Sequence, residues 1–160
     1  MTTLQPVRLT PVRLWLALLA ASLSVQAEEL RSHGQVLYVP VYSEVPYGDK
    51  GFNINLTATL SIRNTDGKNP ISIERVDYFS STGVLVRSYL KQPMLLKPMS
   101  SAEHIVKESD RSGGISASFL VEWASKVPVA PPIVEAVMVN STYNNGIAFN
   151  SQARVLEEKP

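Results

Sequence analysis

The sequence contains no cysteine among its 160 residues and only two histidines, His33 and His104. Without thiols the protein can form neither disulfide bonds nor thiolate metal sites, so its stability must come from packing. Two histidines far apart in sequence are not the close set of ligands typical of a metal centre. We therefore expect no metal and no cofactor, and we interpret both histidines as surface residues.

An excess of charge of one sign is also missing. The chain has 15 lysines and arginines against 14 aspartates and glutamates, and the basic residues are scattered singly. Nucleic-acid-binding proteins usually concentrate basic residues on one face. The composition therefore predicts a partner other than nucleic acid.

The first 27 residues match a secretory signal peptide. Arg8 and Arg13 supply positive charge, Leu14 to Val25 is apolar, and Val25-Gln26-Ala27 offers a cleavage site. The apolar run is shorter than the roughly 20 residues of a membrane span. We therefore expect cleavage before Glu28, no stable membrane anchor, and a location in the bacterial periplasm, with secretion as the alternative.

Helical spacing of apolar residues is missing from the rest of the chain, and alternation takes its place. From Phe52 to Arg63 every second residue is apolar, which is the period of a strand with one buried face. Similar segments separated by turn residues predict about eight strands, at 35–43, 52–63, 71–80, 84–90, 100–109, 115–123, 133–140 and 147–156.

Several of these segments carry a more specific expectation. Pro40 cannot donate to a ladder, so residues 35–43 should form an edge strand or bulge there. The alternation slips once within 71–80, which predicts a bulge. The nearly continuous apolar segment 133–140 predicts a central strand covered on both faces. Trp123, on an alternating strand, is interpreted as a core anchor, and residues 91–99 as a crossover between sheets.

Many short strands with turns every eight to twelve residues are typical of a sandwich or a small barrel. We predict a single all-β domain over residues 35–156, an immunoglobulin-like antiparallel β-sandwich of about 7–8 strands, with a closed barrel as the alternative. Residues 28–34 are expected to be a loose leader and residues 157–160 a frayed tail.

A set of motifs resembles one known family. The motifs are Y-V-P-V-Y-S (38–43), L-T-A-T-L-S-I-R-N-T-D (56–66), P-I-S-I-E-R-V-D-Y-F (70–79), E-S-D-R-S-G-G (108–114), F-L-V-E-W (119–123) and P-P-I-V-E-A-V-M (131–138). Together they resemble DUF3124, a bacterial family of exported proteins known as a domain of unknown function. The resemblance covers nearly all of the chain after residue 27. It implies export and a single domain, and it implies no reaction. The lipid anchor of some members needs a cysteine that this chain lacks.

Three residues have the chemical types of a hydrolase triad, namely His104, Asp110 and Ser112. No nucleophile elbow surrounds Ser112, which lies in a glycine-rich loop. We therefore predict no catalytic residue.

Two groups of oxygen-bearing side chains have the composition of calcium ligands. Both are more typical of turns, in which such side chains bond to their own backbone. The groups are Asp49 with Glu108 and Asp110, and Asn64 with Asp66 and Asn69.

Topology favours one end of the sandwich as a binding site. If strands alternate strictly up and down, the loops at 44–51, 81–83, 110–114 and 143–146 share an end. Tyrosine, asparagine and arginine on loops form a mixture common in binding surfaces, although any polar hairpin end has it too. The candidate partner-binding residues are Tyr47, Asp49, Asp110, Arg111, Tyr143, Asn144 and Asn145.

These observations favour a non-enzymatic exported domain that binds an unknown protein or small-molecule partner through this end. One alternative is a structural or assembly domain that pairs through the edge strand at 35–43. The other is a hydrolase, which requires a deep pocket with two titratable groups within hydrogen-bond reach. The polar face of the strand at 52–63 is interpreted as solvent surface rather than a flat contact face.

Overall fold

The computed structural model describes residues 30–49, 51–140 and 146–160. Within these ranges there is no helix. The described residues form twelve strands: β1 (Ser32–Val41), β2 (Glu44–Tyr47), β3 (Phe52–Asn55), β4 (Thr57–Arg63), β5 (Ile71–Phe79), β6 (Leu85–Ser88), β7 (Met94–Leu96), β8 (Ser101–Val106), β9 (Ala117–Val129), β10 (Ile133–Asn140), β11 (Ile147–Gln152) and β12 (Arg154–Glu158).

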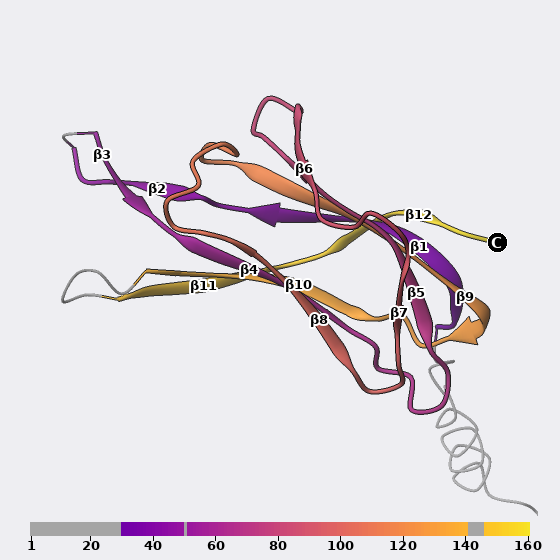
Figure 1. Ribbon diagram of the computed structural model, residues 1–160. Helices are drawn as coiled ribbons and strands as arrows, with labels where there is room; N and C mark the ends of the chain where they lie inside the picture. The colour runs from indigo at the N-terminus through magenta and orange to yellow at the C-terminus, as the bar shows by residue number, and fades with distance from the viewer. Residues whose placement is uncertain (1–29, 50, 141–145) are drawn as a thin grey trace, which may run out of the picture.

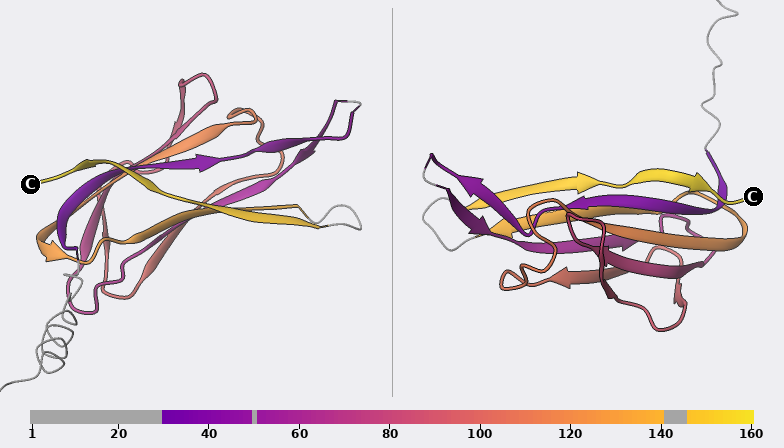
Figure 2. Two further views of the ribbon diagram at one scale, coloured as in Figure 1. Left: turned by 180° about the vertical axis from the view of Figure 1, so that it is seen from behind. Right: turned by 90° about the horizontal axis from the view of Figure 1, so that it is seen from above.

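The strands form two antiparallel sheets, consistent with the predicted all-β sandwich (Figures 1 and 2). The six-stranded sheet has the order β12-β1-β9-β5-β6, with β7 also pairing β5. The four-stranded sheet has the order β11-β10-β4-β8. Strands β2 and β3 pair only with each other. They form a hairpin that projects from one end, and we call it the arm (residues 44–55).

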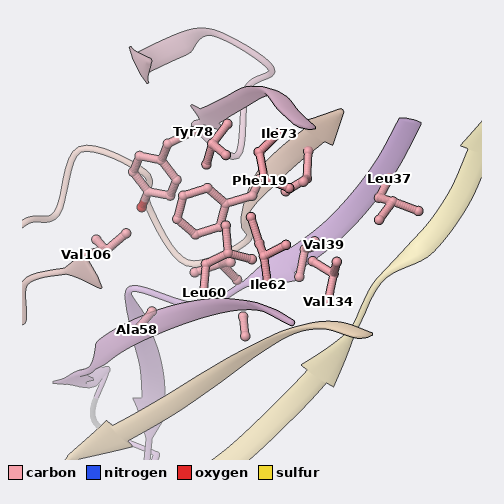
Figure 3. Close-up of a cluster of buried hydrophobic side chains, with 14 of the residues drawn as sticks. Leu37, Val39, Ala58, Leu60, Ile62, Ile73, Tyr78, Val106, Phe119 and Val134 are labelled. Atoms are coloured by element: carbon pink, nitrogen blue, oxygen red, sulfur yellow. The ribbon is translucent and has the colours of Figure 1, made fainter. Parts of the chain in front are cut away.

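The core lies between the inner faces of the two sheets (Figure 3). On β4, Ala58, Leu60 and Ile62 are fully buried, while Thr57 and Thr59 on the other face are half-exposed. The predicted alternation is therefore confirmed for this strand, except that Ser61 on the outer face is also buried.

The six-stranded sheet supplies the other half of the core. Phe119, Val121 and Trp123 of β9 are fully buried. The indole Nε1 of Trp123 donates to Oε1 of Gln35 at 3.3 Å, so its one polar atom is satisfied. The interpretation of Trp123 as a core anchor is confirmed.

Two long predicted strands each break in two, which raises the number of strands above the expected 7–8. The segment 52–63 breaks at Leu56 into β3 and β4, and the Leu56 N–H donates to the Ser43 carbonyl at 2.8 Å. The segment 147–156 breaks at Ala153, where the chain passes from the four-stranded to the six-stranded sheet. The expected loop at 44–51 likewise contains a strand, β2.

Two local predictions are confirmed. Residues 91–99 do connect the sheets, because β7 pairs with β5 and β8 pairs with β4. The register of β5 against β9 shifts between Ile73 and Arg75, at the slip in the alternation.

The expected loose leader and frayed tail are wrong for the residues that enter β1 and β12. Ser32 starts β1, and its hydroxyl donates to Glu158 Oε2 at 2.7 Å. The Lys159 backbone N–H donates to the Gly34 carbonyl at 2.8 Å, and its Nζ lies 2.5 Å from Glu122 Oε1. The two ends of the domain therefore hold each other in the same sheet.

The structure corrects two further expectations and places Pro40. Strand β1 has β9 on one side and β12 on the other, but β12 pairs only residues 35–38, so at Pro40 only β9 pairs with β1, which suits a residue that cannot donate to a ladder. Strand β9 runs to Val129, six residues beyond the predicted end of the strand at 115–123. Strand β10 is covered on one face only: Ile133 is 52% and Val139 41% exposed.

The part of the chain that the structure describes contains no helix long and apolar enough to span a membrane.

We predict that Leu60→Asp unfolds the domain. Leu60 is fully buried on an internal strand, and an unpaired buried charge costs several kcal/mol against a total stability of about 5–15 kcal/mol. Thr59→Asp, on the outer face of the same strand, should change the free energy of unfolding by less than about 1 kcal/mol. Urea unfolding checks both, and a soluble, cooperatively unfolding Leu60→Asp protein would contradict the assigned inner face.

Candidate functional site

One end of the sandwich brings together the arm, the loop between β8 and β9, and the described ends of the β10–β11 hairpin (Figure 1). The Asn140 side chain connects them, because its Nδ2 donates to the Asn55 carbonyl at 2.6 Å and to Glu108 Oε1 at 3.2 Å. The Ser81 N–H donates to the Gly113 carbonyl at 2.8 Å, which adds the β5–β6 turn to this end.

The arm is amphipathic because its register places four apolar side chains on one face. Val45 pairs with Ile54, and Tyr47 pairs with Phe52. Residues two apart on a strand share a face, so these two pairs lie one behind the other. The inner pair is half-buried, whereas Tyr47 is 64% and Phe52 65% exposed.

The turn of the arm depends on glycine. Gly48 has φ 63° and Gly51 φ 71°, which is left-handed backbone that glycine adopts without steric cost. The two aromatic residues flank this turn directly in sequence. An aromatic pair is thus fixed at the exposed tip of a short hairpin.

A cleft of about 460 Å³ lies between the arm and the start of β11. Apolar and aromatic side chains form much of its wall, with two asparagines and a glycine completing it. The lining residues are Tyr47, Phe52, Asn53, Ile54, Asn140, Gly146 and Ile147.

The base of the β10–β11 hairpin is anchored to the six-stranded sheet. The rings of Tyr42 and Phe149 meet edge to face, with centroids 5.7 Å apart. The Ser151 hydroxyl donates to the Pro40 carbonyl. These contacts fix β11 near β1, and the arm and β11 diverge beyond them (Figure 2).

Comparison with family models matches residues 34–156 to the family described as "Protein of unknown function (DUF3124)". The chain belongs to the DUF3124 family. The matched residues of this DUF3124 domain include the arm and every residue that lines the cleft. The resemblance seen in the sequence motifs is therefore confirmed.

The other comparisons add little about this DUF3124 domain. No curated protein matches the chain. The crystal structure of Thermotoga maritima 1070 aligns over 78% of this chain and 97% of that chain, with 14% sequence identity and a TM-score of 0.45. A similarity of that level carries no argument about function.

The predicted binding residues separate into distinct places. Tyr47 lines the cleft, and Asp49 lies exposed in the turn of the arm without lining it. Arg111 is exposed in the β8–β9 loop. The remaining three, Tyr143, Asn144 and Asn145, lie outside the described residues.

Asp110 stabilises its own loop and does not line the cleft. Its Oδ2 lies 2.8 Å from Arg87 Nη2, and its Oδ1 accepts from the Ser112 hydroxyl at 2.5 Å and the Ser112 N–H at 3.1 Å. The hydrogen bond from the Ser112 hydroxyl is the largest cause that lowers the pKa of Asp110, and the Arg87 guanidinium adds to it.

The three triad residue types do not form a catalytic chain. Asp110 and Ser112 share a hydrogen bond, but the His104 ring packs edge-on against Tyr89, with centroids 5.1 Å apart. His104 Nε2 is buried without a hydrogen-bond partner. The expectation of two surface histidines is wrong, since both His33 and His104 are half-buried.

The second group of possible calcium ligands forms a turn, as interpreted. Asp66 Oδ1 accepts from the backbone N–H groups of Lys68 and Asn69, each at 2.8 Å, and these bonds lower the pKa of Asp66. Asn64 Nδ2 donates to the carbonyls of Asn69, Leu96 and Lys97. Among the described residues no group of three or more acidic or histidine side chains is placed to hold a metal ion.

Sequence reasoning missed most of the residues that line the cleft. Phe52, Ile54 and Ile147 continue the alternation of buried positions, so they were expected in the core. The available signal was the pair of aromatic residues flanking the Gly48–Gly51 turn, which indicates a hairpin with its largest side chains at the tip.

We predict that the domain loses stability as the pH falls through the range in which His104 titrates. Burial lowers the pKa of His104 below its ordinary value of 6.5, with Glu103 opposing the shift weakly. The unfolded chain then binds a proton that the folded state does not, so stability is full above about pH 6.5 and declines below it. Urea midpoints measured across this range should slope less in His104→Gln. An unchanged slope in that variant would contradict the prediction.

Proposed function

We propose that this DUF3124 domain is an exported, periplasmic, non-catalytic binding protein with an immunoglobulin-like plan, and that its site is the cleft between the arm and β11. The observation that carries the proposal is the aromatic pair Tyr47 and Phe52, about two thirds exposed at the tip of the arm beside that cleft.

The exposure of two neighbouring aromatic side chains favours the existence of a binding partner that covers them. Burial of one large apolar side chain contributes roughly 1.5–3 kcal/mol, and aromatic anchors provide much of the affinity at protein interfaces. A monomer gains nothing from leaving both rings in water, so a molecule that covers them accounts for their position.

The arm is held by its base and is therefore suited to binding. The Leu56 N–H to Ser43 carbonyl bond and the Asn140 bond to the Asn55 carbonyl fix both strands where they leave the sandwich. A site on a preorganised scaffold loses less conformational entropy on binding.

Export is supported by the signal-like first 27 residues. Strand β1 starts at Ser32, at the end of the sandwich away from the arm, and β12 ends there too (Figure 2). The cleft therefore faces away from both described ends of the chain.

The alternative of pairing through the strand at 35–43 receives little support, because β9 pairs with one side of β1 along its length and β12 already pairs residues 35–38 on the other side. A hydrolase using His104, Asp110 and Ser112 receives no support, since His104 Nε2 has no hydrogen-bond partner and the described residues that line the cleft carry no titratable group except the Tyr47 phenol.

Site-specific photo-crosslinking tests this proposal. We replace Tyr47 with p-benzoylphenylalanine in cells that export the protein, and we expect a discrete adduct by mass spectrometry on mature protein that starts at Glu28. Position 95 is the matched control, because Leu95 is equally exposed, at 66%, but lies on β7.

Adducts at position 95 as abundant as those at position 47, or none at position 47, would contradict the assignment of the site. Retention of the uncleaved leader would contradict the export proposal separately.

A further inference from the structure

We infer that the cleft binds a small uncharged hydrophobic molecule, one with an aromatic or hydrocarbon body and no formal charge. This inference rests on the proposed function and narrows its ligand class.

The walls of the cleft carry the argument for a hydrophobic body. Tyr47, Phe52 and Ile54 form one wall from the apolar face of the arm, and Ile147 of β11 contributes to the other. Two aromatic rings and two branched aliphatic chains present apolar surface to whatever lies between them. A ligand pocket of this kind gains affinity mainly from buried apolar area.

The polar groups of the lining favour an uncharged ligand. Among the described residues that line the cleft there is no aspartate, glutamate, lysine, arginine or histidine. The two polar side chains are the amides of Asn53 and Asn140, and the Nδ2 of Asn140 is committed to the Asn55 carbonyl and to Glu108. A charged ligand would lose hydration here without meeting an opposite charge, which is costly.

The charged side chains near the cleft are directed to other parts of the domain. Glu44 lies on the polar face of the arm, since it is one residue out of phase with Val45 and Tyr47. Glu108 contacts Asn140, and Asp110 pairs with Arg87 on β6. None of these charges lines the cleft, and neither does Asp49, which is exposed in the turn of the arm; among the described residues the walls therefore offer no counter-charge to a cation or an anion.

The size of the cleft fits a single small molecule. Its volume of about 460 Å³ falls within the roughly 300–1,000 Å³ of small-molecule pockets. A flat protein face would cover only the exposed rings and leave the half-buried Ile54 and Ile147 without new contacts. A small ligand contacts all four side chains.

A second groove on the domain provides an internal control. It lies over β5, β7 and β9 and includes Leu95 and Val127, but it also carries the charges of Glu74 and Lys126. It is comparable in size and differs in electrostatic character. A hydrophobic probe that merely adheres to exposed apolar residues should bind there too.

Two fluorescent probes that differ by one sulfonate test the inference on protein purified after export. N-phenyl-1-naphthylamine is neutral, and 8-anilino-1-naphthalenesulfonate adds a negative charge to the same ring system. We expect saturable one-to-one binding of the neutral probe, at least tenfold tighter than the anionic one. The double variant Phe52→Ala/Ile147→Ala should bind the neutral probe at least tenfold more weakly, while Leu95→Ala should bind it with unchanged affinity.

The inference is overturned if the neutral probe does not bind saturably, or if the anionic probe binds with equal affinity. It is also overturned if Leu95→Ala weakens binding of the neutral probe as much as the double variant does. Phe52 is exposed, and Ile147 is only partly buried against the core, so the double variant should still fold and unfold cooperatively, which urea unfolding checks.

The two proposals fail in different ways. A protein adduct at position 47 without binding of the neutral probe would refute the ligand class and leave the binding function standing. Binding of the neutral probe that depends on Phe52, without any adduct at position 47, would refute the biological function and leave the chemistry of the cleft standing.

Discussion

Packing of the inner faces of the two sheets is the interaction on which the whole structure depends. With no cysteine in the chain, nothing covalent supplements it. Leu60 and Ile62 on one sheet pack towards Phe119 and Tyr78 on the other (Figure 3). Each inner face is apolar because it is covered by the opposite face. The cleft follows from the same rule, since the apolar faces of the arm and of β11 continue beyond the point where the sheets diverge.

Polar contacts of Asn140 and an aromatic contact hold the elements at the place where the sheets diverge. Asn140 ties β10 to the arm and to the β8–β9 loop, while the Tyr42–Phe149 contact ties β11 to the end of β1. A cleft between two such anchored walls stays open without a ligand, so binding need not first separate packed surfaces. The ends of the domain lie at the opposite end, where Glu158 joins β12 to Ser32 and Gln35 of β1.

Alternation in the sequence predicted most of the strands and much of the core, because a half-buried strand requires a period of two. The crossover at 91–99 was predicted separately, from two prolines and the lack of a tight turn. Alternation could not predict the breaks at Leu56 and Ala153, since it continues unchanged when a chain passes from one sheet to another. It also assigned Phe52 and Ile147 to the core. Alternation shows which residues share one face of a strand, but it does not show whether another sheet covers that face. Asp110 was expected to bind a partner because its loop shares an end with the other candidate loops. Its ion pair with Arg87, 23 residues away in sequence, could not be predicted from the chain.

The most direct test of the account is where a neutral hydrophobic molecule binds. Isoleucine methyl resonances report this when N-phenyl-1-naphthylamine is titrated into the protein. We expect shifts at Ile54 and Ile147, which line the cleft. We expect none at Ile73, which is buried, or at Ile133, which is 52% exposed but lies at the far end of β10. Shifts at Ile133 equal to those at Ile147 would show that the probe seeks exposed apolar surface in general, and would contradict a specific cleft.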